Sequence, residues 1–206
     1  MRSHRPAALA LSALLMAASP ALAAPRSFAV EQDVHSTNEV SFTSKAAIVK
    51  FVGRTAKLEG EAQLDPANVA KASGKVIVDL ASLDTGISLR NEHMRGALEV
   101  EKFPRAVFSF SGLKVPGNKL VADKPVRGMA TGEMTLHGKA RTITVPVELT
   151  LLPQQDASYR SGDWVHVASQ FKLKVTDYGV QLPQGVFGLK VAEEMEIAID
   201  GMARAR

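Results

Sequence analysis

The stretch LDTGISLRNEHMRGALEVEKFP, residues 83–104, is the one long interruption in a sequence that otherwise alternates between apolar and polar positions. A turn is expected at residues 84–86, and residues 89–95 have a helical pattern. Gly96 stands where a glycine commonly ends a helix. We therefore predict one short helical crossover around residues 87–97, with four ionisable side chains: Arg90, Glu92, His93 and Arg95. Such a segment either closes or gates one end of a β-structure, or is a solvated connection without function.

On both sides of this segment the chain has the period-two pattern of strands with one dry and one wet face. The clearest case is residues 143–151, where isoleucine, valine and leucine occupy every second position. His137 and Gly138 form the tight turn of a hairpin between this strand and the preceding one, residues 127–136. About ten strands are expected, spaced for hairpins. We predict an all-β fold, an antiparallel barrel, because closure removes exposed strand edges.

The first 23 residues have the features of a secretory signal peptide. Arg2, His4 and Arg5 form a basic head, and residues 7–18 are an apolar run too short to span a bilayer. Small residues before Ala24 match a cleavage site. We expect cleavage before Ala24, a single domain over residues 24–206, and a periplasmic location; an uncleaved membrane anchor is the alternative.

Composition argues against several classes of function. Loss of Arg2 and Arg5 with the signal peptide lowers the net charge from +4 to +2. Basic residues do not cluster along one predicted element and aromatic residues are few, so no nucleic-acid partner is expected. The chain has no cysteine, which excludes thiol catalysis and thiolate metal ligands. Its stability must come from core burial without disulfides.

No catalytic site can be assembled from the sequence. A Gly-x-Ser-x-Gly elbow is absent. Glu92 and His93 are adjacent, so they point about 100° apart on a helix and do not match a zinc-binding pair. His137 is interpreted as a solvated turn residue, and Glu193 and Glu194 as protection of a strand edge. We therefore expect no catalytic residue, no metal and no cofactor.

The central stretch resembles the YceI-like family of polyisoprenoid-binding or lipid-binding periplasmic proteins. The resemblance is carried by VDLASLDTG (78–86), RNEHMR (90–95) and EKFP (101–104), followed by Phe108. Shorter matches occur in order along the chain: NEVSF (38–42), FVG (51–53), LEG (58–60), LHG (136–138), VPV (145–147) and DYG (177–179). The resemblance covers about residues 27–201. It implies a lipocalin-like barrel that encloses an isoprenoid or fatty-acyl tail, with the helical segment near one end and no catalysis.

Three functions stay open from the sequence. The first is a carrier of an apolar small molecule; its expected ligand-binding residues are Phe42, Phe51, Leu89, Arg90, His93, Met94, Arg95, Phe108, Phe110, Met134 and Phe171. For each apolar residue the alternative is ordinary core packing. The second is a barrel filled by its own side chains that docks to an envelope component or membrane redox partner. The third is a hydrolase. The sequence also leaves open whether the protein forms a homodimer.

Overall fold

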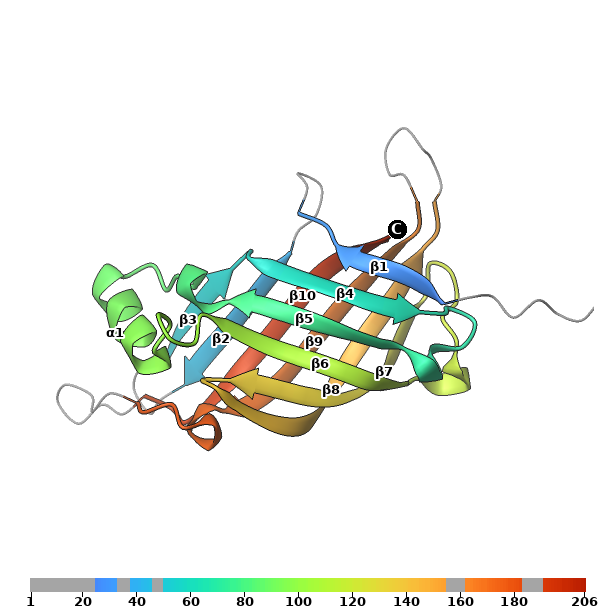
Figure 1. Ribbon diagram of the computed structural model, residues 1–206. Helices are drawn as coiled ribbons and strands as arrows, with labels where there is room; N and C mark the ends of the chain where they lie inside the picture. The colour runs from blue at the N-terminus through green and yellow to red at the C-terminus, as the bar shows by residue number, and fades with distance from the viewer. Residues whose placement is uncertain (1–24, 33–37, 46–49, 155–161, 183–190) are drawn as a thin grey trace, which may run out of the picture.

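The structure is a computed structural model that describes residues 25–32, 38–45, 50–154, 162–182 and 191–206. The expected signal peptide and its cleavage point lie outside these residues. The described chain contains ten strands and one α-helix, in agreement with the strand number expected from the sequence (Figure 1). The strands are β1 (Arg26–Val30), β2 (Glu39–Lys45), β3 (Lys50–Thr55), β4 (Leu58–Leu64), β5 (Ser73–Asp79), β6 (Arg105–Lys114), β7 (Pro125–Leu136), β8 (Lys139–Leu152), β9 (Trp164–Lys174) and β10 (Glu194–Ala205).

Eight of the strands close into an antiparallel ring. The order is β1-β4-β5-β6-β7-β8-β9-β10, and β10 pairs back onto β1. The first half of β10 pairs with β2 from Met195 to Asp200, and its last residues pair with β1 from Ala203 to Ala205. The hairpin of β2 and β3 therefore extends one end of the barrel rather than joining the ring. The prediction of an all-β, lipocalin-like antiparallel barrel is confirmed.

The hairpin of β7 and β8 follows from its turn residues. His137 and Gly138 both have positive φ, 51° and 72°. This suits a two-residue turn whose twist matches that of the strands. Pairing then runs without interruption from Leu136↔Lys139 to Pro125↔Thr150. The predicted hairpin is confirmed.

One end of the barrel is closed by the protein's own side chains. This packed end lies opposite the α-helix and carries the short 3-10 helices η1 (Val69–Lys71) and η3 (Pro116–Asn118) (Figure 1). Val69 is fully buried there, and Val115, Leu120 and Leu151 join it in one hydrophobic cluster. These four residues form an ordinary core at this end.

The other end is covered by helix α1 (Ser88–Leu98) (Figure 1). The crossover predicted around residues 87–97 is present, but Gly96 does not end it. The helix continues to Leu98, and Glu99 takes the left-handed conformation, φ 47°, that terminates it. At this helix end the N–H of Glu99 donates to the Gly96 carbonyl at 3.1 Å and the N–H of Val100 donates to the Arg95 carbonyl at 3.2 Å. The Glu99 carboxylate lies 2.7 Å from Nε2 of His137.

Two other interpretations of single residues were wrong. The His137 side chain is only 13% exposed, because the Phe103 ring packs against its imidazole at 4.8 Å between centroids. Glu193 and Glu194 protect no strand edge, because β10 is paired on both sides. They form ion pairs with Lys174 and Lys172 instead.

Candidate functional site: an apolar cavity under helix α1

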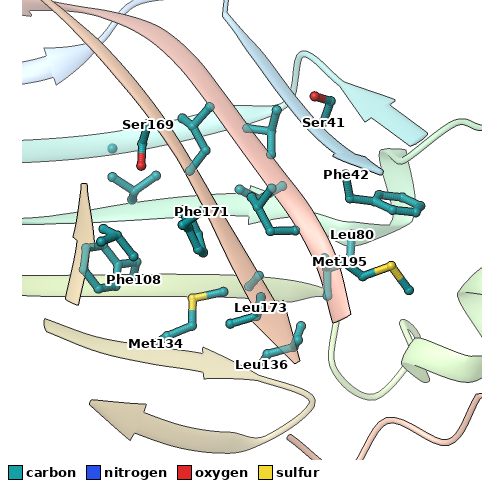
Figure 2. A pocket seen from close by; sticks show the side chains of 18 of the residues that line it. Ser41, Phe42, Leu80, Phe108, Met134, Leu136, Ser169, Phe171, Leu173 and Met195 are labelled. Atoms are coloured by element: carbon teal, nitrogen blue, oxygen red, sulfur yellow. The ribbon is translucent and has the colours of Figure 1, made fainter. Parts of the chain in front are cut away.

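A cavity of about 460 Å³ lies inside the barrel between the packed end and α1. This is within the range of small-molecule sites, about 300–1,000 Å³. Figure 2 shows apolar side chains from several strands converging on it, among them Phe108, Met134 and Phe171. The strands place these side chains inward because alternate residues of a strand face the same side. Every strand of the ring contributes to the lining, so the cavity is a property of the whole barrel.

Nine of the eleven residues that the sequence suggested for ligand binding line the cavity. They are Phe42, Phe51, Arg90, His93, Met94, Phe108, Phe110, Met134 and Phe171. Their contact with a ligand stays a prediction.

Leu89 and Arg95 do not line the cavity. Leu89 is 61% exposed, and Nε of Arg95 donates to the carbonyl of Ala81. Helix geometry explains the difference, since Arg90, His93, Met94 and Ala97 recur every three or four residues and share one face. Applying that spacing to the sequence would have removed both residues from the set.

Sequence reasoning missed most of the aliphatic lining. The missed residues sit at alternate positions of the strands and include Val76, Val78, Val145, Val147, Ile197 and Ile199. The period-two pattern predicted that Val145 and Val147 share one face of their strand. The pattern does not distinguish a position that faces an empty cavity from one that faces another side chain.

Two phenylalanines lie against the barrel wall over glycines. A Cβ atom added at Gly53 would come within 2.2 Å of the Phe42 ring, and one at Gly74 within 2.8 Å of the Phe110 ring. Gly53 pairs with Phe42, and Gly74 pairs with Phe110, on neighbouring strands. The missing side chains let both rings fold sideways, which keeps them out of the centre of the cavity.

A polar cluster fixes the start of α1. The Asn91 amide donates to Oδ1 of Asp84 at 2.7 Å, and the Asn91 carbonyl oxygen accepts from both N–H and Oγ1 of Thr85. Asp84 is joined to β3 by two backbone hydrogen bonds with Arg54. The Asn91 amide and the Gly86 N–H hold the pKa of Asp84 below its usual value. This cluster orients α1 over the end of the barrel.

A row of contacts links α1 to the β2–β3 hairpin at the edge of the cavity. The Arg90 guanidinium lies over the Phe51 ring, 4.8 Å from its centroid. Phe51 in turn meets Phe42 edge-on at 6.0 Å between centroids. An arginine over an aromatic face gains roughly 0.5–1 kcal/mol where it is exposed. This row closes the side of the cavity where the hairpin leaves the ring.

Polar groups in the cavity wall are few. The charged residues of the described chain that border the cavity are Glu61, Lys75 and Arg90, and the side chains of Glu61 and Lys75 are 68% and 45% exposed. Ser41 and Ser169 also contribute (Figure 2). Within the ranges that the structure describes, no three His, Cys, Asp or Glu side chains are grouped to hold a metal ion. None of the described helices has the length and apolar character that crossing a membrane requires.

The chain is similar to known proteins over most of its length. Residues 31–203 match the YceI-like domain. A UPF0312 protein of Vibrio cholerae is 31% identical over 155 residues, which is 74% of each chain. Protein YceI of Salmonella arizonae is 27% identical over 146 residues, 70% of each chain.

Solved structures show the same architecture. The crystal structure of BcnA from Burkholderia cenocepacia has a TM-score of 0.64 and 26% identity, covering 80% of this chain and 95% of BcnA. A polyisoprenoid binding domain from Saccharophagus degradans has a TM-score of 0.67 and 16% identity, covering 87% of this chain and 98% of that domain. Both solved structures have the same fold as the closed barrel described above, and the domain match and the Vibrio relative point to the same family. The chain belongs to the YceI-like domain family.

Proposed function

We propose that the protein is a non-catalytic periplasmic carrier that encloses one apolar lipid chain, isoprenoid or fatty-acyl, inside its barrel. The observation that supports this most directly is the cavity of about 460 Å³ with an almost wholly apolar lining. Each methylene moved from water into such a site contributes about 0.8 kcal/mol. The polyisoprenoid binding of the Saccharophagus domain, which shares the fold, points to the same class of ligand.

The dimensions of the cavity suit a single chain. Its lining on β9 extends from Val165 to Leu173, which is about 26 Å along a strand at about 3.3 Å per residue. Strands of a barrel tilt by about 40°, so this span is about 20 Å along the barrel axis. One leaflet of a bilayer core is about 15 Å deep. The cavity is therefore long enough for one membrane-lipid tail.

The periplasmic location rests on the signal peptide expected at residues 1–23. A mass spectrum of the exported protein tests it: cleavage before Ala24 gives the mass of residues 24–206, and retention of the first 23 residues would contradict the location.

The alternative is a barrel that acts through its surface on an envelope or membrane redox partner. It is favoured by Ile87 and Leu89 at the start of α1, which are 49% and 61% exposed. Such a barrel would need no ligand in its cavity. The experiment below separates the two functions, and size-exclusion chromatography of the same samples distinguishes a monomer from a homodimer.

The carrier proposal is tested with delipidated protein and a fluorescent fatty acid. Ile197 of β10 lies between Phe42 of β2 and Phe171 of β9 and lines the cavity. Ile197→Trp should fill the cavity and weaken binding at least tenfold. Ala198→Trp is the matched control, because Ala198 is the next residue on the same strand and faces the outside of the barrel. A wild-type protein that binds no fatty acid, or two variants that bind alike, would contradict the carrier function.

A further inference from the structure

The charges in the cavity wall do not cancel. The side chains of Glu61 and Lys75 are 68% and 45% exposed on the outer side of their strands, where Nζ of Lys75 lies 3.7 Å from Oε1 of Glu61. Arg90 is the other charged residue that borders the cavity within the described chain. None of the ion pairs among the described residues joins Arg90 to a carboxylate. The cavity therefore carries one positive charge without a countercharge among these residues, at the end covered by α1.

Arg90 is placed to meet a ligand rather than solvent alone. Its side chain is half-buried and its guanidinium is held over the Phe51 ring. That contact leaves the N–H groups at the edge of the guanidinium plane able to donate. His93, one turn along α1, lines the same side of the cavity. Apolar surroundings strengthen any charge interaction formed there, because the local dielectric is lower than that of water.

We infer that the ligand is an amphiphile with an acidic head group, a carboxylate or a phosphate, and that Arg90 binds this head while the tail extends toward Phe108 and Phe110. This inference rests on the proposed carrier function and narrows its ligand class. A planar guanidinium matches the paired oxygens of carboxylates and phosphates, which an ammonium group or a neutral donor does not. The head group lies under α1 because the opposite end of the barrel is closed by packed side chains.

The matched control is on the same helix. Arg95 carries the same charge five residues further along α1, but it lies outside the cavity and donates to the Ala81 carbonyl. A general attraction of acids to a basic helix would depend on both arginines. A head-group site at Arg90 would depend on Arg90 alone.

The experiment measures displacement of the neutral probe N-phenyl-1-naphthylamine from delipidated protein by dodecanoate, dodecyl phosphate and dodecan-1-ol. At least one of the two acids should bind about tenfold or more tightly than the alcohol, which is the effect of about 1.4 kcal/mol from a charge-assisted pair. In Arg90→Gln this ratio should fall to about one while the affinity for dodecan-1-ol stays within about twofold. Arg95→Gln should keep the wild-type ratio, and Arg90→Lys should give an intermediate one, because it keeps the charge without the planar fork.

The outcomes test the acidic head group and the carrier function separately. Binding of all three ligands with equal affinity would overturn the acidic head group and leave the carrier function intact. An Arg95→Gln variant that loses the preference as fully as Arg90→Gln would also overturn the assignment to Arg90. Failure of all three ligands to bind, checked by calorimetry, would instead contradict the carrier function itself. Carboxylate and phosphate are distinguished by which of the two acids shows the preference for Arg90.

Discussion

The two ends of the barrel are built from the same kinds of strand but differ in what fills them. At the packed end, Val69 and Leu120 are buried in a hydrophobic cluster and do not line the cavity. At the helix end, α1 has no fully buried residue and covers a cavity. Both ends therefore contain buried apolar side chains, but only at the helix end does a covering element, α1, also line the cavity. The side chains of α1 that face the cavity have space beside them, and the proposed ligand would fill it.

The largest expected effect comes from making the same substitution at both ends. Leu120→Ala removes a buried side chain that lies outside the cavity, which should lower the free energy of unfolding by about 3 kcal/mol. Leu98→Ala, on α1, removes a half-buried side chain that already faces the cavity, so the loss should be about 1 kcal/mol. Urea unfolding of the delipidated proteins measures both. Equal losses would mean that the two ends are packed alike.

Two glycines sharpen the comparison. A Cβ at Gly132 would lie 2.3 Å from the backbone oxygen of Ser109, so Gly132→Ala must separate β6 from β7 and should cost about 2 kcal/mol of stability. A Cβ at Gly53 meets the Phe42 ring, which lines the cavity, so we expect the ring to turn into that space. Gly53→Ala should therefore cost less than about 1 kcal/mol of stability but weaken fatty-acid binding about tenfold, a change of about 1.4 kcal/mol. Unfolding and ligand titration of both variants test this, and a Gly53→Ala protein with unchanged affinity would count against the position of Phe42.

The polar cluster at the start of α1 predicts a local effect. Asn91→Ala removes the hydrogen bonds to Asp84 and Thr85, each worth about 0.5–1.5 kcal/mol. Hydrogen exchange of the α1 amides should become about tenfold faster, which corresponds to about 1.4 kcal/mol. The amides of the β7–β8 hairpin serve as the internal control and should exchange at the wild-type rate. Equal acceleration in both regions would show that α1 and the ring open as one unit.

The smallest expected effect is a pH dependence away from the cavity. The hydrogen bond from Arg26, together with one from the Gln154 N–H, lowers the pKa of Asp163. A carboxyl whose pKa is lower in the folded state stabilises the protein above its unfolded pKa, and this is lost as pH falls through the folded pKa. Because the pair is partly exposed, Asp163→Asn should cost about 0.5–1 kcal/mol at neutral pH. Urea unfolding at neutral and acidic pH should show the variant and wild type converging below the unfolded pKa of about 3.9. A difference that persists in acid would contradict the assignment.

The sequence predicted the features that depend on local pattern. Alternation predicted the strands, and the turn at His137 and Gly138 predicted the central hairpin. Features that depend on distant contacts were not accessible. Glu99 ends α1 in a left-handed conformation, and its carboxylate lies beside His137 of the distant β7–β8 turn. The ring of Phe103 buries His137, which sequence position alone assigned to solvent.

Prediction of the candidate site was limited in a related way. The family resemblance indicated which segment lies near the cavity, and helical periodicity would have separated Arg90 from Arg95. Whether an inward-facing position borders empty space depends on how side chains from several strands fill the barrel. Beside Gly53 and Gly74, the space left in the cavity depends on the direction in which a neighbouring phenylalanine ring is turned. No local pattern in the sequence carries this information.

The central claim is that the cavity under α1 holds a lipid chain. Native mass spectrometry of protein purified from its own cellular compartment, compared with the same sample after delipidation, tests it most directly. The account predicts that the native protein is heavier by the mass of one lipid, and that extraction of the sample yields a single-chain acid. Identical masses before and after delipidation would contradict it.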